Sequence, residues 1–221
     1  MPDAPKVTLL SSSARRREIV SNSFSDAAIE DSRGEEPRPS EAEAAEDYVV
    51  RSAVAKLGGP PGPGEDGLLV SADTVVVLEG EILGKPSSKE EARSMLNRLS
   101  DAWHQVITGV AVQKARTGEV FTSSETSSVK TRPFSAAEVE EYISSPEPYD
   151  KAGGYAVQDD VFRPVVMTEG CYLNIVGLPL CSVLTLMRRH DPAVELRDLR
   201  SIPYYDRCND CKLPGVAEGL P

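Results

Sequence analysis

The stretch from Leu68 to Pro86 contains residue types whose spacing could do chemistry. Asp73 lies within an apolar run, and Lys85 follows twelve residues later, after a short turn. If the two apolar runs pair as neighbouring strands, the carboxylate and the ammonium can share one ligand. A carboxylate that holds a metal ion or a water, with an ammonium that holds phosphate, suits hydrolysis of a phosphoanhydride. Taken alone, the pattern also fits a turn aspartate and an ordinary Gly-Lys-Pro turn.

A second candidate site lies near the N-terminus, where a short apolar run is followed by three serines and three arginines. The hydroxyl residues Ser11 and Ser13 would leave backbone N–H groups free at a helix N-terminus, where the helix dipole favours an anion. Arg15 and Arg16 add positive charge. The pattern predicts a phosphate cradle without the glycines of a P-loop. The alternative is an N-cap serine followed by a solvated basic turn.

Three further polar residues could reach the same ligand. Lys151 precedes two glycines, which let the backbone approach a ligand closely. A strand predicted over residues 155–157 delivers Gln158 to its end. Lys56 lies at the edge of the apolar stripe of a helix predicted over residues 42–57, and it can equally be a solvated lysine.

The elements that must position these residues alternate between strands and helices. Apolar runs and alternation predict strands over residues 6–10, 68–77, 103–112, 120–131 and 155–157. Helical spacing and capping residues predict helices after the serine cluster and over residues 42–57, 88–99, 135–143 and 180–187. Consecutive strands favour a mixed sheet, so the predicted fold class is α/β. From residue 191 to 221, charges and prolines predict a poorly ordered tail after a single domain, residues 1–190.

Composition and charge restrict the class of protein. With 221 residues and 40% hydrophobic content, the chain can bury one sizeable core. The net charge of −11 argues against a broad nucleic-acid or acidic-membrane surface, because binding there needs a cationic face. No apolar run approaches the roughly 18 to 20 residues of a membrane span. We therefore expect a soluble, cytoplasmic protein whose partner is neither a nucleic acid nor a membrane.

The four cysteines are too few for a disulfide scaffold in a chain of this length. Cys208 and Cys211 form one C-x-x-C pair, for which zinc would need two further ligands. A metal or redox module at this pair is one hypothesis. A pair of reduced thiols on a mobile tail is the other.

Six short motifs occur in an order and with separations that resemble the Maf-like nucleotide pyrophosphatases. The resemblance covers roughly Val7 to Met187, and it extends to the Maf-like domain of animal acetylserotonin methyltransferase-like proteins. The motifs lie at residues 11–16 (SSSARR), 71–74 (SADT), 84–86 (GKP), 104–109 (HQVITG), 150–158 (DKAGGY followed by Q) and 174–179 (NIVGLP).

The resemblance implies a mixed twisted sheet with helices, arranged as two lobes around an elongated cleft, and a possible homodimer. It also implies hydrolysis of nucleoside triphosphates to the monophosphate and pyrophosphate. Asp73 would be the proton acceptor, and Mg²⁺, or another divalent cation such as Mn²⁺, would lie between Asp73 and the acids Glu30 and Asp31. The residues that would neutralise the departing pyrophosphate are Lys85, Lys151, Arg15 and Arg16, with Lys56 as a further match.

Three positions carry the prediction of substrate. Arg15, Thr74 and Gln158 match the residues of the branch that acts on dTTP and UTP. A carboxamide presents an acceptor beside a donor, which suits the N3–H and the adjacent carbonyl of uracil or thymine. The resemblance therefore favours a pyrimidine nucleotide as substrate.

One segment departs from the family pattern. The segment of residues 18–29 is about five residues shorter than the one in which the family fits the end of a helix, a turn and a strand. This predicts a missing strand, which could misplace Glu30 and Asp31. A second hypothesis follows, a catalytically weak or inactive nucleotide-binding or interaction protein that keeps the cleft.

Overall fold

The computed structural model describes residues 5–208 and contains one seven-stranded mixed sheet. The strand order is β2-β1-β3-β5-β6-β7, and β4 pairs with the far end of β3. β1 runs parallel to β2 and β3, whereas the other neighbours are antiparallel. The strands are β1 (Val7–Leu10), β2 (Ala27–Glu30), β3 (Leu68–Leu78), β4 (Glu81–Leu83), β5 (Trp103–Lys114), β6 (Val120–Thr131) and β7 (Val165–Glu169).

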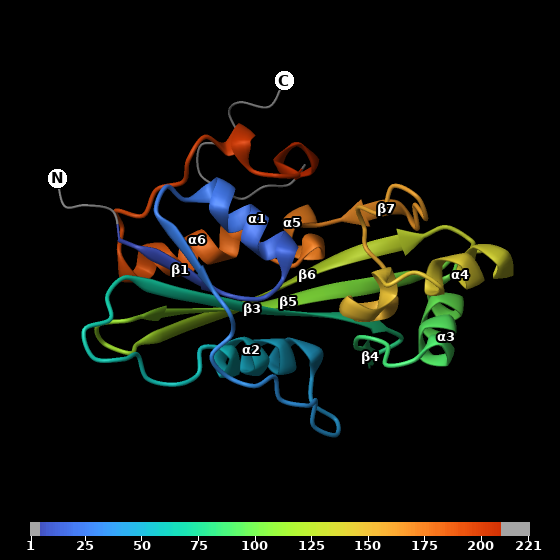
Figure 1. The fold of residues 1–221 in the computed structure, drawn as a ribbon, viewed down its shortest axis with the longest axis horizontal. Helices are drawn as coiled ribbons and strands as arrows, with labels where there is room; N and C mark the ends of the chain where they lie inside the picture. The colour runs from blue at the N-terminus through green and yellow to red at the C-terminus, as the bar shows by residue number, and fades with distance from the viewer. Residues whose placement is uncertain (1–4, 209–221) are drawn as a thin grey trace.

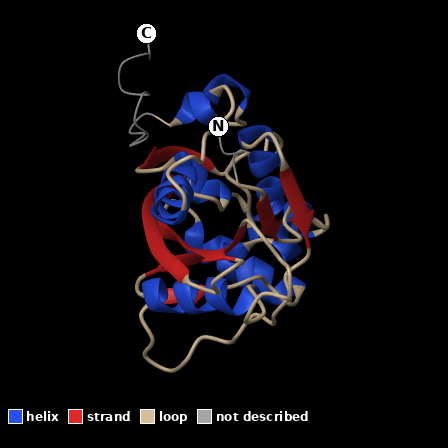
Figure 2. Cartoon of the chain, turned by 90° about the vertical axis from the view of Figure 1, so that its left-hand side faces the viewer, coloured by secondary structure: helices blue, strands red, loops and turns tan. Residues whose placement is uncertain are grey.

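Helices cover both faces of this sheet (Figures 1 and 2). The α-helices are α1 (Ala14–Ser23), α2 (Ala45–Lys56), α3 (Lys89–Leu99), α4 (Ala136–Ile143), α5 (Tyr172–Val176) and α6 (Leu180–His190). α1, α5 and α6 lie on one face and α2 lies on the other, while α3 and α4 lie near one end of the long strands (Figure 1). The predicted α/β fold class is confirmed. Within residues 5–208, no helix is both long and apolar enough to cross a bilayer.

Alternation along β3 explains the two layers of helices. Leu68, Val70 and Ala72 belong to the apolar cluster that includes residues of α1 and α6. Leu69 and Val75, at the alternate positions of the same strand, point the other way and pack in the clusters that include residues of α2. Because successive side chains of a strand point to opposite faces, one buried strand supports both layers.

Two packed regions share the long strands. One apolar cluster joins β1 and the first half of β3 to α1, α5 and α6. Another joins the second half of β3 to α3 and α4. These regions are the two lobes of the predicted fold. β3 and β5, with 11 and 12 residues, run through both lobes and hold them on one sheet.

The strand predicted to be missing from residues 18–29 is present, so that prediction is wrong. α1 ends at Ser23, and β2 begins at Ala27 after a turn of three residues. β2 pairs with β1 in parallel register, with Val7 opposite Ala27. The shorter segment is accommodated by a tight turn whose first residue, Phe24, is buried in the core.

Two other expectations need correction. No strand forms over residues 155–157; two short 3-10 turns, Glu147–Asp150 and Ala152–Gly154, lead into a loop there. Residues 191–208 are not a poorly ordered tail, because three apolar side chains anchor them in the core formed with α1 and α6. Those side chains are Val194, Ile202 and Cys208. Residues 209–221, including Cys211, lie outside the described residues.

Candidate active site

The sheet opens in the middle of β3, and Asp73 lies at this opening. On one side β3 pairs continuously with β5. On the other side it pairs with β1 through Leu68–Val70 and with β4 through Val76–Leu78. Residues 71–75 have no strand partner on that side. The edge of the sheet is therefore accessible there, as at the switch points where α/β proteins bind ligands.

Asp73 and Thr74 are neighbours in sequence but contact opposite layers of helices. Asp73 Oδ1 lies 2.5 Å from the Nζ atom of Lys56, at the end of α2. Thr74 Oγ1 accepts a hydrogen bond of 2.9 Å from the Nη2 atom of Arg16, in the first turn of α1. Because β3 lacks a strand partner here, both side chains still line one pocket.

Gly109 allows α2 to approach the sheet closely at this point. It lies opposite Asp73 in the β3–β5 register. A Cβ atom at Gly109 would lie 2.3 Å from the carbonyl carbon of Val49 in α2. Only a residue without a side chain fits between the strand and the helix. The close approach positions α2, which brings the Lys56 ammonium to the Asp73 carboxylate.

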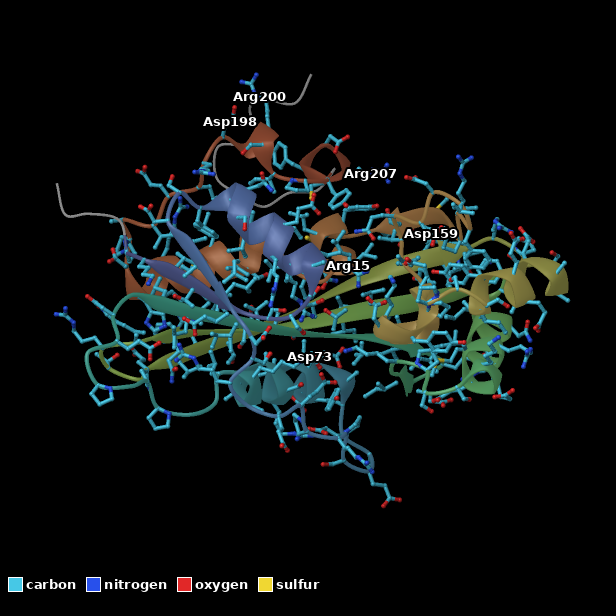
Figure 3. All side chains as sticks on the ribbon, in the orientation of Figure 1. Arg15, Asp73, Asp159, Asp198, Arg200 and Arg207 are labelled. Carbon is cyan, nitrogen blue, oxygen red and sulfur yellow. The ribbon has the colours of Figure 1, made fainter. Side chains whose placement is uncertain are left out.

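Two adjoining pockets extend from this opening. The inner pocket is lined by polar residues and by an apolar wall, principally Arg16, Asp73, Thr74, Lys151, Tyr155, Gln158, Val176 and Gly177. The outer pocket is lined by the serine cluster and by residues of both charges, principally Ser11, Ser13, Arg15, Glu36, Lys56, Lys85 and Asp150. The pockets share Arg15, Lys56 and Lys85, so they form one elongated cleft. Arg15 projects from α1 and Asp73 from β3 near the middle of the molecule, whereas Asp198 and Arg200 lie at its periphery (Figure 3).

The cations of the cleft are placed differently with respect to solvent. Lys151 is 7% exposed, and its Nζ atom donates to the Glu147 carboxylate at 2.9 Å and to Asp150 at 2.6 Å. Lys85 is exposed and lines both pockets. Burial lowers the pKa of the Arg16 guanidinium, although the nearby Asp73 carboxylate opposes that shift. The cleft therefore combines cations held in fixed ion pairs with one that reaches into solvent.

All predicted site residues line the two pockets except Glu30 and Asp31, which the structure places elsewhere. Glu30 forms an exposed ion pair of 2.9 Å with Arg33, and Asp31 forms one of 2.6 Å with Arg17. β2 directs both acids to the surface. The structure therefore does not bring these two acids together with Asp73.

Glu36 is the acid that reaches the cleft in their place. Its Oε2 atom lies 2.9 Å from Lys56 Nζ, so Lys56 bridges Glu36 and Asp73. Burial raises the pKa of Glu36, but the charges of Lys56, Lys85 and Arg16 lower it by more, so it lies below the ordinary value. Sequence reasoning missed this residue because it lies in a Pro- and Glu-rich loop without periodicity.

The carboxylates present fit a divalent cation that also takes ligands from a substrate. The Oδ2 atom of Asp73 is buried and has no hydrogen-bond partner in the described part of the chain. Among residues 5–208, no group of three or more His, Cys, Asp or Glu side chains is arranged to hold a metal ion. Mg²⁺ commonly binds through one or two carboxylates plus substrate phosphates and water. Asp73, with Glu36 nearby, meets that requirement.

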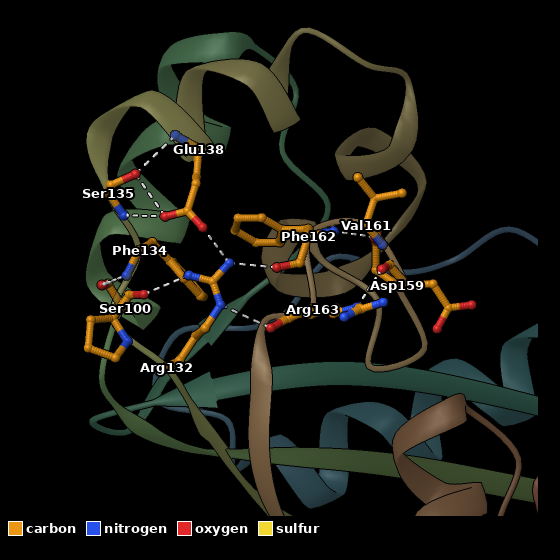
Figure 4. A network of polar contacts seen from close by, with 11 residues as sticks. Ser100, Arg132, Phe134, Ser135, Glu138, Asp159, Val161, Phe162 and Arg163 are labelled. Atoms are coloured by element: carbon orange, nitrogen blue, oxygen red, sulfur yellow. Dashed lines mark hydrogen bonds and ion pairs between the residues drawn. The ribbon is translucent and has the colours of Figure 1, made fainter.

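A polar network fixes the loop that carries Gln158 (Figure 4). The Oδ1 atom of Asp159 accepts hydrogen bonds from two backbone N–H groups, including that of Phe162 at 2.7 Å. Arg132 donates to the carbonyl of Phe162 at 2.6 Å and pairs with Glu138 at the start of α4. The Nε2 atom of Gln158 is buried without a hydrogen-bond partner within residues 5–208. The loop thus leaves an amide donor for a ligand of the inner pocket.

His104 supports the same wall of the cleft from behind. Its Nε2 atom lies 2.5 Å from the hydroxyl oxygen of Tyr155, which lines the inner pocket. Burial lowers the pKa of His104 to about 4, so the imidazole is neutral near pH 7.

The fold and the cleft together define a class of protein. A mixed α/β sheet opens beside a buried carboxylate, and cations from α1, α2 and the β4 region surround that opening. Such an arrangement suits a phosphorylated ligand that binds with a divalent cation. The family model described as Maf-like protein matches residues 6–190, and the chain belongs to this family.

Curated relatives are similar over most of the chain. A protein of Dehalococcoides mccartyi named dTTP/UTP pyrophosphatase is 38% identical over 203 residues, which are 90% of each chain. A protein of Hahella chejuensis with the same name is 40% identical over 195 residues, 85% of this chain and 93% of that one. A third, from Dictyoglomus thermophilum, is 36% identical over 184 residues, 83% and 95% of the two chains. The resemblance drawn from the six motifs is confirmed.

Proposed function

We propose that this protein is a nucleoside triphosphate pyrophosphatase that hydrolyses dTTP and UTP to the monophosphate and pyrophosphate. One observation carries the proposal: the Asp73 carboxylate lines the inner pocket at the opening of the sheet, and its ion-pair partner Lys56 lines both pockets. The names of the relatives, which share 36–40% identity over at least 83% of this chain, support the same activity and substrates.

The two pockets suit the two parts of a nucleotide. The outer pocket contains the backbone at the start of α1 and the side chains of Arg15 and Lys85, which bind phosphate oxygens. The inner pocket has an apolar wall and the carboxamide of Gln158, which suit a pyrimidine base. With the nucleoside in the inner pocket, the phosphorus nearest to Asp73 is the α-phosphorus.

In the proposed reaction, a water molecule attacks the α-phosphorus while Asp73 accepts one of its protons. A new bond forms between the water oxygen and the α-phosphorus, and the bond from that phosphorus to the bridging oxygen breaks. The departing pyrophosphate gains negative charge, which Lys56, Lys85 and Arg15 stabilise from the outer pocket. Lys151, held by Glu147 and Asp150, lines the inner pocket.

Asp73 and Glu36 are the residues that would hold a divalent cation, Mg²⁺ or Mn²⁺. When bound, the cation would neutralise phosphate charge beside the attacked phosphorus. The single unpartnered oxygen of Asp73 supports this choice. We also propose a homodimer and a cytoplasmic location, to be tested by light scattering and by cell fractionation.

Measurement of pyrophosphate release tests the proposal directly. Purified protein with Mg²⁺ is assayed against dTTP, UTP, CTP and GTP, and the nucleotide product is identified. We expect pyrophosphate and the monophosphate, with dTTP and UTP turned over fastest. Tight binding of dTTP without turnover would instead support the second hypothesis, a catalytically weak or inactive protein that keeps the cleft.

A further inference from the structure

A chain of hydrogen bonds runs from Arg16 through two threonines to a backbone carbonyl. Arg16 Nη2 donates to Thr74 Oγ1 at 2.9 Å. Thr74 Oγ1 lies 2.9 Å from Thr108 Oγ1 on the neighbouring strand β5. Thr108 Oγ1 donates to the carbonyl oxygen of Asn174 in α5 at 3.1 Å. Thr108 is fully buried, whereas Thr74 is partly exposed and lines the inner pocket.

The groups at the two ends of this hydrogen-bond chain, a guanidinium and a carbonyl, fix the direction in which each hydroxyl donates its proton. A guanidinium only donates hydrogen bonds and a carbonyl only accepts them, whereas a hydroxyl has one proton to give. Because Thr108 gives its proton to Asn174, it can bond to Thr74 only as an acceptor. Thr74 must therefore give its single proton to Thr108. What Thr74 retains for a ligand in the pocket is a lone pair, so it acts there as an acceptor.

Further hydrogen bonds hold the residues at both ends of this hydrogen-bond chain in place. The side-chain amide of Asn174 donates to the carbonyl of Val106 at 2.9 Å and to the hydroxyl of Ser127 at 2.8 Å. Arg16 Nε donates to the carbonyl of Gly177 at 2.8 Å. Reversal of the proton order would break the bond from the buried Thr108 hydroxyl to the Asn174 carbonyl, which would keep only the Gly177 N–H at 2.9 Å. The acceptor character of Thr74 is therefore built into the fold.

We propose that Thr108 is a specificity-determining residue that acts through Thr74, as a positioning residue that fixes the Thr74 hydroxyl as an acceptor toward the nucleoside. The inference rests on the proposed function for the identity of the ligand. The group it selects is an N–H or O–H donor. Uracil and thymine have such a donor at N3, where cytosine has only an acceptor, and the sugar hydroxyls are the other donors on a uracil or thymine nucleotide. Ionised phosphates have none, so this residue reads the nucleoside.

Two substitutions of Thr108 separate the hydroxyl from the volume of the side chain. Thr108→Val removes the hydroxyl and keeps the shape, so the Thr74 proton becomes free to turn toward the pocket. Thr108→Ser keeps the hydroxyl and serves as the matched control. Dissociation constants are measured for α,β-methylene analogues of UTP, CTP and 2′,3′-dideoxy-UTP, which cannot be cleaved between the α- and β-phosphates.

In Thr108→Val, we expect the preference for the UTP analogue over either the CTP analogue or the dideoxy analogue to fall about tenfold. This factor corresponds to the loss of one hydrogen bond. A loss against CTP identifies the base N–H as the donor, and a loss against the dideoxy analogue identifies a sugar hydroxyl. Thr108→Ser should retain both preferences within about twofold. A folded Thr108→Val protein with both preferences unchanged would overturn the inference.

A double-mutant cycle distinguishes this role from a merely structural one. Thr74→Val removes the acceptor itself and should abolish the same preference. Adding Thr108→Val to Thr74→Val should then change it no further, because Thr108 acts through Thr74. A further change in the double variant contradicts the inference. If Thr108→Val does not fold, Thr108→Ala, which also lacks the hydroxyl, takes its place in both experiments. Because the analogues report binding, a wild-type protein that binds them but does not hydrolyse UTP refutes the proposed function and not this inference.

Discussion

The two ends of the cleft are built from different interactions. At the phosphate end, charged groups neutralise one another before any ligand arrives, as Lys56 does between Asp73 and Glu36. At the nucleoside end, the hydroxyls of Thr74 and Thr108 are held by buried hydrogen bonds. The first end can rearrange its ion pairs when a triphosphate binds. The second end has a fixed pattern of donors and acceptors.

This difference indicates that the two ends of the cleft have separate roles. Ion pairs between long side chains exchange partners readily and are screened by salt, so they suit a reaction in which charge moves. A buried network of hydroxyl and amide groups permits few alternatives, so it suits discrimination between bases. We therefore expect substitutions at the phosphate end to change the rate and substitutions at the nucleoside end to change selectivity.

The largest effect is expected from Asp73→Asn. Loss of the proton acceptor should lower kcat about 10²- to 10⁴-fold, by the same factor for UTP and for CTP. The amide keeps an oxygen near Lys56, and Lys56 keeps its partner Glu36, so the protein should fold. The control is Asp66→Asn, which removes an exposed carboxylate paired with Arg116 and should leave kcat unchanged. A decrease confined to one nucleotide would contradict the assignment of rate to the phosphate end and of selectivity to the nucleoside end.

A buried imidazole at the nucleoside end should make the protein sensitive to acid. The pKa of His104 is lowered to about 4 in the fold, against about 6.5 in the unfolded chain. Between these values the unfolded state takes up a proton that the folded state does not, so stability falls as the pH falls. By pH 4.5 the loss is about 2–3 kcal/mol. His104→Gln should lose that much less between pH 7.5 and 4.5 in denaturant titrations, and equal losses would exclude His104 as the cause.

Substitution of Gly109 tests whether the close packing of α2 on the sheet is needed to position Lys56 beside Asp73. Gly109→Ala forces a Cβ atom against the backbone of Val49 and should lower the free energy of unfolding by about 1–3 kcal/mol. Activity should fall as well, because displacement of α2 moves Lys56 away from Asp73. Gly62→Ala is the matched control, since the nearest atom to its Cβ, on Glu65, is 3.9 Å away. If the two variants unfold at the same denaturant concentration, the close approach of α2 is not required.

The smallest effect on activity is expected from substitution of Glu36, the acid of the outer pocket. Because the pKa of Glu36 is lowered, the side chain is charged at neutral pH, and Glu36→Gln removes a real negative charge. At limiting Mg²⁺ we expect activity to fall about tenfold and to recover as Mg²⁺ is added, as for loss of one ligand contact. Glu30→Gln changes only an exposed pair with Arg33 and should stay within about twofold of wild type. The reverse ranking would restore Glu30 as the metal ligand.

Features set by local pattern could be predicted from the sequence. The hairpin of β3 and β4, which brings Asp73 and Lys85 to one cleft, follows from two apolar runs and a short turn. Ser88 and Ser135 cap α3 and α4 as their spacing indicates. These features depend on neighbours within a few residues, and the helix and strand periods report such neighbours directly.

Features set by distant contacts could not be predicted. Glu36 reaches the cleft because its loop folds back onto Lys56, twenty residues later, and no periodicity signals that return. Residues 191–208 look polar, yet three irregularly spaced apolar side chains, including Val194, anchor them to the core. β2 forms by pairing with β1, and its residues Ala27–Glu30 are only partly buried or exposed, so they lack the apolar run that signals β1.

The central claim is that the nucleoside lies inside and the phosphates outside, so that Asp73 faces the α-phosphorus. Hydrolysis of UTP in water enriched in oxygen-18 tests this most directly, with mass spectrometry of both products. We expect one labelled oxygen in uridine monophosphate and none in pyrophosphate. Label in pyrophosphate would show that water attacks the β-phosphorus, and it would contradict the placement of the substrate in this cleft.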